Sequence, residues 1–472
     1  MSPSRGIGTP SAWVLVAACV GYGMVILDIT VVNVALPSIS HALQTTTTGL
    51  EWVLDGYSLS FAVFLLSAGA LSDRRGAKEV FLAGLVLFSM ASLACGLAPT
   101  ITVLVAARLI QGLGAAVAVP ASLALVQAAY PEPASRARAI GLWGAMAGVA
   151  AAAGPALGGV TVGTLGWRAV FFINIPLGAA GLALGARHLP RPPRRPHSLD
   201  LAGQLAAVSC VAGLATALIE AGGRGWTSPV VVAGVAVFLA AGAVFVAVEH
   251  SSRGPMLPLG LFASPTFSAA TVVGLLCNLG FFGELFVISL YLQQVRGLSP
   301  LVTGLLLVPQ MAATIVGSMT SGRVMARRGP RLPMLVGLCL GAAGLGGLAV
   351  TDQHTPYLLL LPSFIAAGFG ISFAMMPATA AVMDAAPPAR GGIASGALNA
   401  SRQLGGMVGV ALLGSFVTRP ADFATGLRLA MGIAGGAFLC GAVLSACLIG
   451  PRRPPASLGQ NVPRGGDGAN AR

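Results

Sequence analysis

The chain has 472 residues, of which 56% are hydrophobic and only 9% are charged, and its mean hydropathy is +0.85. A soluble domain cannot bury that much apolar surface, so the composition excludes a soluble fold and indicates an integral membrane protein. The net charge of +13 does not indicate a nucleic-acid partner, because the basic residues lie in short connections between apolar runs, where membrane topology explains them.

Fourteen apolar runs follow one another along the chain, each of about the 20 residues that a helix needs to cross the hydrocarbon core. They are centred near residues 22, 62, 88, 112, 150, 177, 210, 238, 280, 311, 341, 370, 404 and 438. If the N-terminus is cytoplasmic, the inner connections hold 20 Lys and Arg residues and the outer ones hold five. This bias predicts a multi-pass protein of the inner (cytoplasmic) membrane with both termini inside. We also expect no removable signal peptide, because the first dozen residues lead directly into a full-length span without a small-residue cleavage site.

The first two runs each carry an acid. Asp28 lies in the string LDITVVNVALP, where an ionised, unpaired carboxylate is very costly, so we expect Asp28 to bind and release protons. The alternative is a neutral side chain that only packs helices through Thr30 or Asn33. Asp55, near the outer end of the second run, is a second protonation site, a contact for a cationic substrate, or an interfacial acid that reaches headgroup water.

A charged hairpin, GALSDRRGAK from Gly69 to Lys78, joins the second run to the third. Asp73 in this hairpin can cap a helix and pair with an arginine of a neighbouring helix, which would latch two parts of the molecule together. The alternative is a solvated, positively charged loop.

In the fourth run Arg108 is too costly to leave unpaired, so we expect Asp28 or a backbone carbonyl to be its partner.

The fifth run is rich in glycine. Together with Pro155, its glycines are expected to let the helix bend and approach a partner closely; they are Gly141, Gly144, Gly148, Gly154, Gly158 and Gly159. They form no nucleotide-binding loop, because the only lysine, Lys78, follows Ala77 and no Walker A string exists. The sequence therefore excludes an ATP-driven pump.

An internal repeat divides the chain. The hairpin at Gly69 returns as GRVMARRGPR at Gly322, a shift of 322 − 69 = 253 residues, and GLGAAVAVP at Gly112 returns as GFGISFAMMP at Gly368. Such a repeat predicts two six-helix halves in the same orientation. We expect the halves over residues 1–190 and 256–450, a basic linker with two inserted helices over 191–255, and a disordered cytoplasmic tail over 451–472.

The first run of the second half carries Glu284, which we expect to face a central cavity rather than to serve as a satisfied packing residue. The expected wall of a substrate cavity consists of Asn33, Phe281, Phe282, Met311, Met375 and Met376, although Met and Phe at helical spacing more often pack in a core or face lipid. The seven cysteines show no CxxC spacing and the five histidines do not cluster, so we expect neither a disulfide, nor a metal site, nor catalytic residues.

Four strings in order carry a family resemblance: LDITVVNVALP, GALSDRRGAK, RLIQGLGAAVAVP and GPALGG, the last from Gly154 to Gly159. They resemble the major facilitator superfamily, in particular its fourteen-helix drug:proton antiporter branch of multidrug and methylenomycin-type antibiotic-resistance exporters. The implied fold is all-α, with 14 transmembrane helices arranged as six, two and six. The chain departs from the pattern at Ala150, where the branch usually has glycine, and at Ala326, which replaces an acid in the second hairpin.

The resemblance implies proton-coupled export of drugs or antibiotics by alternating access, and export or import of an endogenous metabolite is the alternative. The implied proton-coupling residues are Asp28, Arg108, Asp55 and Glu284, with Arg402 a weaker candidate; the implied latch is Gly69, Asp73, Arg74, Arg75 and Gly76; and the antiporter motif is Gly154, Pro155, Gly158 and Gly159. The expected partners are a small-molecule drug, protons and the lipid bilayer. The proton gradient is the expected energy source without a cofactor, and the expected state is a monomer that binds no nucleic acid.

Overall fold

The computed structural model describes residues 12–192, 200–252, 255–352, 354–387, 390–417 and 423–450. Every regular element in these ranges is helical. Apolar runs of this length form helices in a bilayer because a helix satisfies its backbone hydrogen bonds within one segment. The expected disordered tail lies outside the described residues, as do residues 193–199 of the basic linker.

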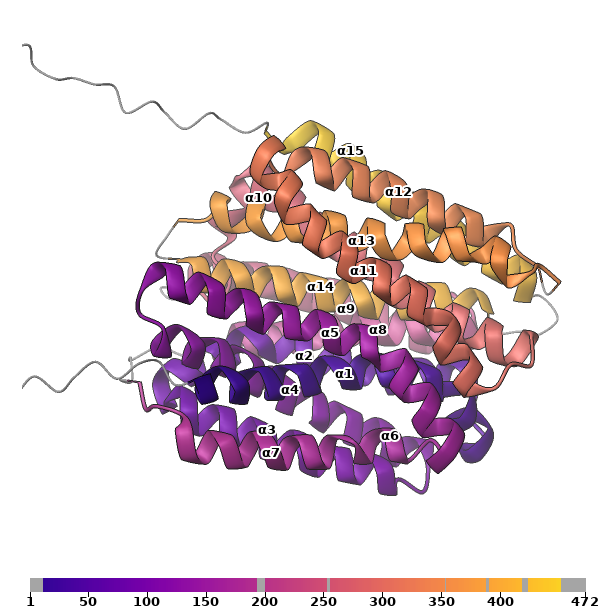
Figure 1. Ribbon diagram of the computed structural model, residues 1–472, viewed down its shortest axis with the longest axis horizontal. Helices are drawn as coiled ribbons and strands as arrows, with labels where there is room; N and C mark the ends of the chain where they lie inside the picture. Colours follow the sequence, from indigo (N-terminus) through magenta and orange to yellow (C-terminus); the bar gives the residue numbers. More distant parts are fainter. Residues whose placement is uncertain are drawn as a thin grey trace, which may run out of the picture.

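The N-terminal bundle contains the first seven helices, coloured indigo to magenta in Figure 1. They are α1 (Ala12–Leu43), α2 (Thr47–Arg75), α3 (Ala77–Leu97), α4 (Ile101–Ala129), α5 (Pro133–Leu165), α6 (Ala169–Phe172) and α7 (Asn174–His188). Within it α3 packs on α4, α1 packs on α5, and α2 packs on α4. The short helix α6 continues into α7, and the two together are long enough for one membrane span.

The C-terminal bundle contains the helices after residue 258. They are η1 (Leu259–Ala263), α10 (Pro265–Leu290), the π-helical turn η2 (Tyr291–Val295), α11 (Pro300–Arg328), α12 (Arg331–Ala349), α13 (Tyr357–Ala385), α14 (Gly391–Gly414), η4 (Ser415–Val417) and α15 (Phe423–Leu448). Here α10 packs on α14 and α12 packs on α13. Each of the fourteen centres expected from the sequence falls inside a helix of one bundle or of the hairpin between them.

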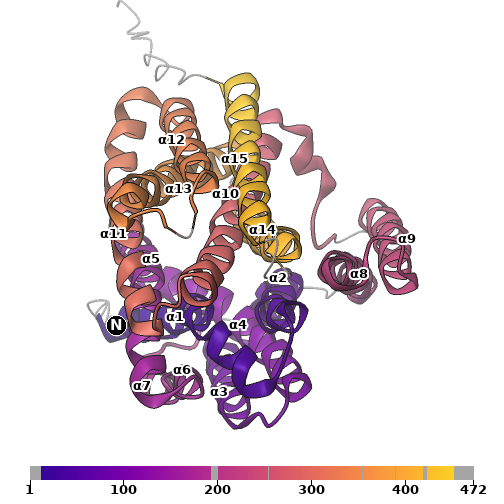
Figure 2. The same ribbon diagram turned by 90° about the vertical axis from the view of Figure 1, so that its right-hand side faces the viewer.

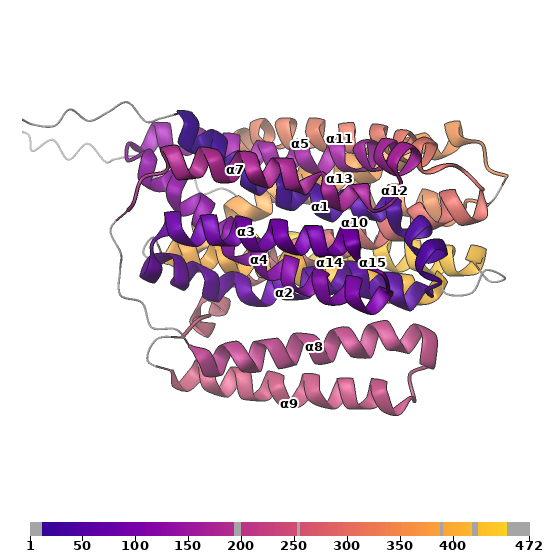
Figure 3. The ribbon, with the colours of Figure 1, turned by 90° about the horizontal axis from the view of Figure 1, so that it is seen from below.

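The hairpin of α8 (Leu201–Arg224) and α9 (Pro229–Ser251) lies beside the two bundles, as Figures 2 and 3 show. Its inner helix, α8, packs on α2 and α14. This arrangement agrees with a pair of helices inserted between two halves. The residue boundaries expected for the halves and the insertion stay a prediction.

Twelve helices in the described ranges are long and apolar enough to cross a membrane, and there are 13 if α2, which bends by 56° between Leu65 and Ser67, forms one span. The remaining run, α14, carries Asn399, Arg402 and Gln403, which lower its hydropathy. It is nevertheless 24 residues long and packs between α10 and α2. The chain is thus a multi-pass membrane protein, and the count of fourteen spans stays a prediction.

The two bundles meet closely at one end, where α5 contacts α11 and α2 contacts α14. A Cβ added at Gly159 of α5 would lie 2.7 Å from the carbonyl oxygen of Pro300, and one at Gly304 of α11 would overlap with the carbonyl oxygen of Pro155. Only glycine permits this approach. On the positive-inside assignment this end is the outer one, because it includes the last turns of α5 and the first turn of α11.

The other half of α5 makes no comparable approach. A Cβ at Gly141, Gly144 or Gly148 would have no atom within 4 Å. The expectation that these three glycines support close helix contacts is therefore wrong. They lie on exposed turns of α5, whereas Gly154, Gly158 and Gly159 lie on the turns that touch α1 and α11.

Candidate functional site

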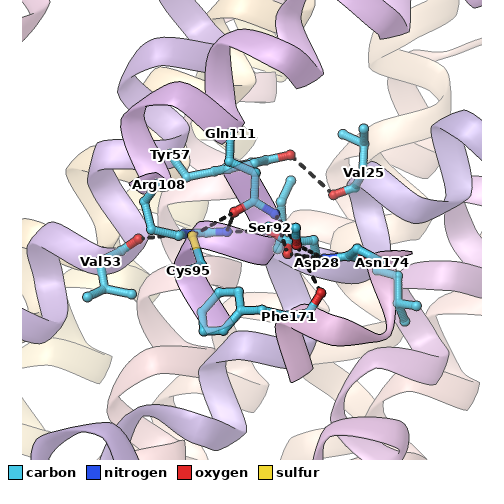
Figure 4. A network of polar contacts seen from close by, with 12 residues as sticks. Val25, Asp28, Val53, Tyr57, Ser92, Cys95, Arg108, Gln111, Phe171 and Asn174 are labelled. Atoms are coloured by element: carbon cyan, nitrogen blue, oxygen red, sulfur yellow. Dashed lines mark hydrogen bonds and ion pairs between the residues drawn. The ribbon is translucent and has the colours of Figure 1, made fainter. Parts of the chain in front are cut away.

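A buried ion pair lies inside the N-terminal bundle (Figure 4). Asp28 of α1 is 0% exposed and Arg108 of α4 is 1% exposed, and Nη1 of Arg108 donates a hydrogen bond to Oδ2 of Asp28. Nε of Arg108 also donates to the carbonyl oxygen of Val53 over 2.9 Å. Both partners that the sequence suggested for Arg108, a carboxylate and a carbonyl, are thus present. Each buried charge is compensated, as a low-dielectric interior requires.

The second oxygen of Asp28 accepts hydrogen bonds from two side-chain amides. Nε2 of Gln111 donates to Oδ1 over 2.9 Å, and Nδ2 of Asn174 donates to it over 2.7 Å. The hydroxyl of Ser92 accepts from both amides, at 3.1 and 2.8 Å, and donates to the carbonyl oxygen of Phe171. Thr30 and Asn33 are not its partners, because those side chains bond to carbonyls of α1, and the role of Asp28 in binding and releasing protons stays a prediction.

The sequence analysis missed Gln111, Ser92 and Asn174. Gln111 follows Arg108 by three residues, so the two lie on the same face of α4, and Nη1 of Arg108 donates to its Oε1 over 2.8 Å. That spacing was a usable signal. Ser92 and Asn174 carry no such signal, because only the packing of α3 and α7 on the rest of the bundle brings them to Asp28.

The guanidinium of Arg108 also lies over an aromatic ring. Its Cζ is 4.3 Å from the ring centroid of Tyr57 of α2, and the Tyr57 hydroxyl donates to the carbonyl oxygen of Val25 over 3.3 Å. Cation–π attraction of this kind is strongest when water is excluded. Tyr57 therefore helps to hold the arginine at the junction of α1, α2 and α4.

Two further acids of α2 lie buried near its first turns. Asp55 and Glu51 are both 0% exposed, and their carboxylate oxygens have no hydrogen-bond partner within the described chain. The alternative that Asp55 is an interfacial acid reaching headgroup water is therefore wrong: α2 packs on α4, α14 and α8, and the Asp55 side chain is inaccessible to solvent. Glu51 escaped the sequence analysis, although its spacing of four residues from Asp55 places both on one face.

Glu51 approaches α14 and the inserted hairpin. A Cβ at Gly414 of α14 would overlap with its Oε1. On α8, the neighbouring Glu220 accepts from Nε1 of Trp52 over 3.1 Å and from Nε of Arg224 over 2.6 Å. Because Arg224 is 60% exposed, this group of acids extends from solvent at the end of α8 to the buried face of α2.

Glu284 of α10 occupies a different environment. It is 1% exposed, and Nε2 of Gln310 of α11 donates to its two oxygens at 2.9 and 2.7 Å. No cation in the described ranges pairs with it. Glu284 is absent from the lining of the pocket described next, and its expected place at a central cavity stays a prediction.

A narrow pocket lies between the two bundles. Its wall combines both bundles and reaches Arg108 of the buried network; the lining residues are Ile29, Asn33, Leu54, Tyr57, Ser58, Arg108, Phe282, Gln403, Gly406 and Val410. It contains about 10 Å³ of free space, roughly what one water molecule needs. A drug-sized molecule would therefore require the bundles to move apart.

The pocket contains two of the six residues expected in the cavity wall, Asn33 and Phe282. The other four residues lie outside this pocket, and their place in the wall of a substrate cavity stays a prediction. Met311 is 1% exposed in the core of the C-terminal bundle, and Met376 is 48% exposed on α13. Phe281 and Met375 pack partly buried against that core. Hydropathy identified these residues as apolar but could not tell which helix face meets the other bundle.

The hairpin between α2 and α3 turns at Gly76, whose φ of 103° is unfavourable for other residues. Arg74 and Arg75 are exposed. Lys78 is only 9% exposed, and its Nζ donates to the carbonyl oxygens of Ala186 and Leu189 at 2.9 and 3.0 Å. The solvated-loop alternative is therefore wrong for Lys78, which satisfies carbonyls at the end of α7.

Comparisons with known proteins agree with this architecture. The Major Facilitator Superfamily model matches residues 18–410. The Methylenomycin A resistance protein of Streptomyces coelicolor is 39% identical over 92% of this chain and 91% of its own, and the Multidrug resistance protein Stp of Mycobacterium tuberculosis is 40% identical over 85% and 75%.

Two solved structures share the fold. A D-xylose-proton symporter superposes with a TM-score of 0.67 at 15% identity, covering 93% of this chain and 98% of that one. A bacterial homologue of the human lysosomal transporter Spinster, inward-facing and unoccupied, superposes with a TM-score of 0.62 at 16% identity, covering 94% and 97%. At these identities the likeness concerns the fold alone.

Proposed function

The chain belongs to the Major Facilitator Superfamily, and we propose that it is a proton-coupled exporter of drugs or antibiotics that works by alternating access. The observation that carries the proposal is the buried Asp28–Arg108 pair, because Arg108 also lines the pocket between the bundles. The names of the relatives, which are resistance proteins, support a drug or antibiotic as the substrate.

In this proposal Asp28 is the principal proton carrier. Protonation of its carboxylate removes the negative charge opposite Arg108, which then keeps the Val53 carbonyl, Gln111 and the rings of Tyr57 and Phe171 as contacts. The arginine can therefore move relative to the pocket that it lines. Because one residue is shared by both sites, proton and substrate affect one another's binding, and the coupling is reciprocal.

The buried acids of α2 are proposed as further proton sites. Asp55 and Glu51 lack hydrogen-bond partners within the described chain, and an ionised carboxylate in such a setting is costly. Glu220 and the exposed Arg224 connect this face with solvent. Glu284, held by Gln310, is a candidate in the C-terminal bundle.

The closed contact between α5 and α11 is proposed as the outer gate. The antiporter-motif residues Gly154 and Gly158 pack on Thr30 and Val31 of α1, and Gly159 packs on α11. The motif thereby joins the helix of Asp28 to the opposite bundle. Opening of this contact would accompany closure on the other side, where the latch of Gly69, Asp73, Arg74, Arg75 and Gly76 would form.

The remaining proposals follow from the positive-inside bias and the family. The protein lies in the cytoplasmic membrane with both termini inside, works as a monomer, and uses the proton gradient without a cofactor. Substrate enters from the cytoplasm or the inner leaflet and leaves on the outer side.

The test is substrate-induced proton release from purified protein in detergent, with cationic dyes and antibiotics as ligands. Wild type is compared with Asp28→Asn, and Glu79→Gln, which changes an acid paired with the exposed Arg191, is the matched acid-to-amide control. We expect release from wild type, loss of release in Asp28→Asn, and retained release in the control. A ligand that binds wild type without releasing protons would contradict antiport and favour a metabolite carrier of another mechanism.

A further inference from the structure

A second arginine lies inside the helical bundle, and it has no acidic partner within the described chain. Nη2 of Arg402 of α14 donates to Oγ1 of Thr379 over 2.5 Å and to the carbonyl oxygen of Met375 over 3.4 Å, both on α13. Its Nε is buried without a hydrogen-bond partner. Arg108 differs because it pairs with the carboxylate of Asp28. The hydroxyl and the carbonyl that contact Arg402 accept its hydrogen bonds but carry no negative charge to offset the guanidinium.

An uncompensated guanidinium within the membrane is expensive, and such residues commonly serve function. Two buried acids already have other partners: Asp28 pairs with Arg108, and Glu284 accepts hydrogen bonds from Gln310. Arginine stays protonated in proteins, so Arg402 cannot escape its cost by releasing a proton. A mobile anion that enters the bundle would neutralise it.

Arg402 is placed where a ligand would pass. The next residue, Gln403, lines the pocket between the bundles, and Arg402 itself is only half-buried. Across the interface, Tyr22 of α1 is close enough for its hydroxyl and the guanidinium to interact electrostatically. Trp143 of α5 is stacked on Tyr22. It lies in the part of α5 around Gly141 and Gly144, where a Cβ added at either glycine would meet no atom within 4 Å.

The Tyr22–Trp143 pair provides an apolar wall opposite the cation. The ring centroids are 3.9 Å apart and the planes differ by 10°, and Nε1 of Trp143 is fixed by a 3.1 Å hydrogen bond to Oγ of Ser122. One bundle thus supplies a rigid aromatic surface and the other supplies a free positive charge. A ligand that matches both has a flat apolar body and a carboxylate.

We infer that Arg402 binds the carboxylate of the exported compound, so that aromatic and other apolar organic acids are a substrate class of this protein. The carboxylate accepts hydrogen bonds from the guanidinium, including the Nε that now has no partner, and the apolar body lies against Tyr22 and Trp143. This inference rests on the proposed exporter function and adds a substrate class to it. It also gives Arg402 a role in binding rather than in proton transfer.

The test uses three probes with one ring system: 2-naphthoate, methyl 2-naphthoate and 2-naphthylmethylamine. Their binding to purified full-length protein in lipid-free detergent is measured by calorimetry for wild type, Arg402→Gln and Arg402→Lys. We expect wild type to bind the acid about 10- to 100-fold more tightly than the ester, which is the range for a hydrogen-bonded charge pair. Arg402→Gln should abolish this preference, and Arg402→Lys should keep part of it because the charge remains.

The exposed Arg428 of α15 supplies the matched control, since Arg428→Gln removes the same charge away from the interface and should leave the preference unchanged. Tighter binding of the amine, an unchanged preference in Arg402→Gln, or no binding of any probe by wild type would each overturn the inference. Efflux of ethidium from cells expressing the protein is measured in parallel. If that efflux persists while the naphthoate result is negative, the substrate assignment fails and the exporter function stands.

Discussion

The two halves each bury an acid on their first helix, but the acids have different surroundings. Asp28 of α1 faces a cation and two amide donors, whereas Glu284 of α10 is held by one amide, Gln310. The repeat shows how the halves diverged: with the shift of 253, Gln310 stands where the first half has Tyr57, since 57 + 253 = 310. The related positions contact different groups, because Gln310 donates to the acid whereas Tyr57 lies against Arg108.

The cation is what distinguishes the halves. With the shift of 256 that relates Gly112 to Gly368, the counterpart of Arg108 is Phe364, since 108 + 256 = 364, and Phe364 is fully buried in the core. A charged acid can be accommodated beside Arg108, but no cation in the described chain offsets a charge on Glu284. The two halves thus repeat the same helices but differ in charge. The buried ion pair lies in the N-terminal bundle.

Removal of the cation should have the largest effect. Arg108→Ala leaves Asp28 buried without its counter-charge, and we expect the free energy of unfolding to fall by about 3–5 kcal/mol. Denaturant unfolding in detergent measures the loss, and the double variant with Asp28→Asn should lose less than the sum of the two single changes. A loss no larger than that of the exposed control Arg428→Ala would show that the pair contributes nothing to stability.

Loss of Gln310, the one donor to Glu284 among the described residues, should have the next largest effect. Gln310→Leu preserves much of the side-chain volume but leaves both carboxylate oxygens without a donor, and the expected cost is about 2–3 kcal/mol. The same unfolding measurement tests it. If Gln310→Leu leaves the free energy of unfolding unchanged, Glu284 does not depend on this amide, and the proposed difference between the two acids fails.

Loss of one donor among several should cost less. Asn174→Leu removes one amide from Asp28 while Arg108 and Gln111 remain, so we expect a loss of about 1 kcal/mol. A loss equal to that of Gln310→Leu would mean that the network around Asp28 has no redundancy.

The smallest effect is expected for Glu284→Gln. The introduced amide can donate to Oε1 of Gln310, which has no partner at present, so the free energy of unfolding should change by less than about 1 kcal/mol. The equivalent change in the other half, Asp28→Asn, strands Arg108 and should cost several times more. Equal costs for the two acid-to-amide changes would contradict the charge asymmetry.

The sequence determined which segments are helices, because long apolar runs leave no other way to satisfy backbone hydrogen bonds in a bilayer. It also predicted both kinds of partner for Arg108, since an unpaired guanidinium at that depth is too costly. Its motifs indicated the superfamily. These inferences depend on local composition and spacing, which are present in the chain before it folds.

The tertiary structure alone decided how each helix is rotated and what it touches. The packing of α4, α8 and α14 on α2 leaves Asp55 and Glu51 buried, and only the junction of several helices brings Asn174 to Asp28. The same reason places Met376 on an exposed face of α13, outside the pocket that Arg108 lines. Hydropathy measures the mean character of a run, whereas the partner of each side chain depends on interhelical packing between segments far apart in the sequence.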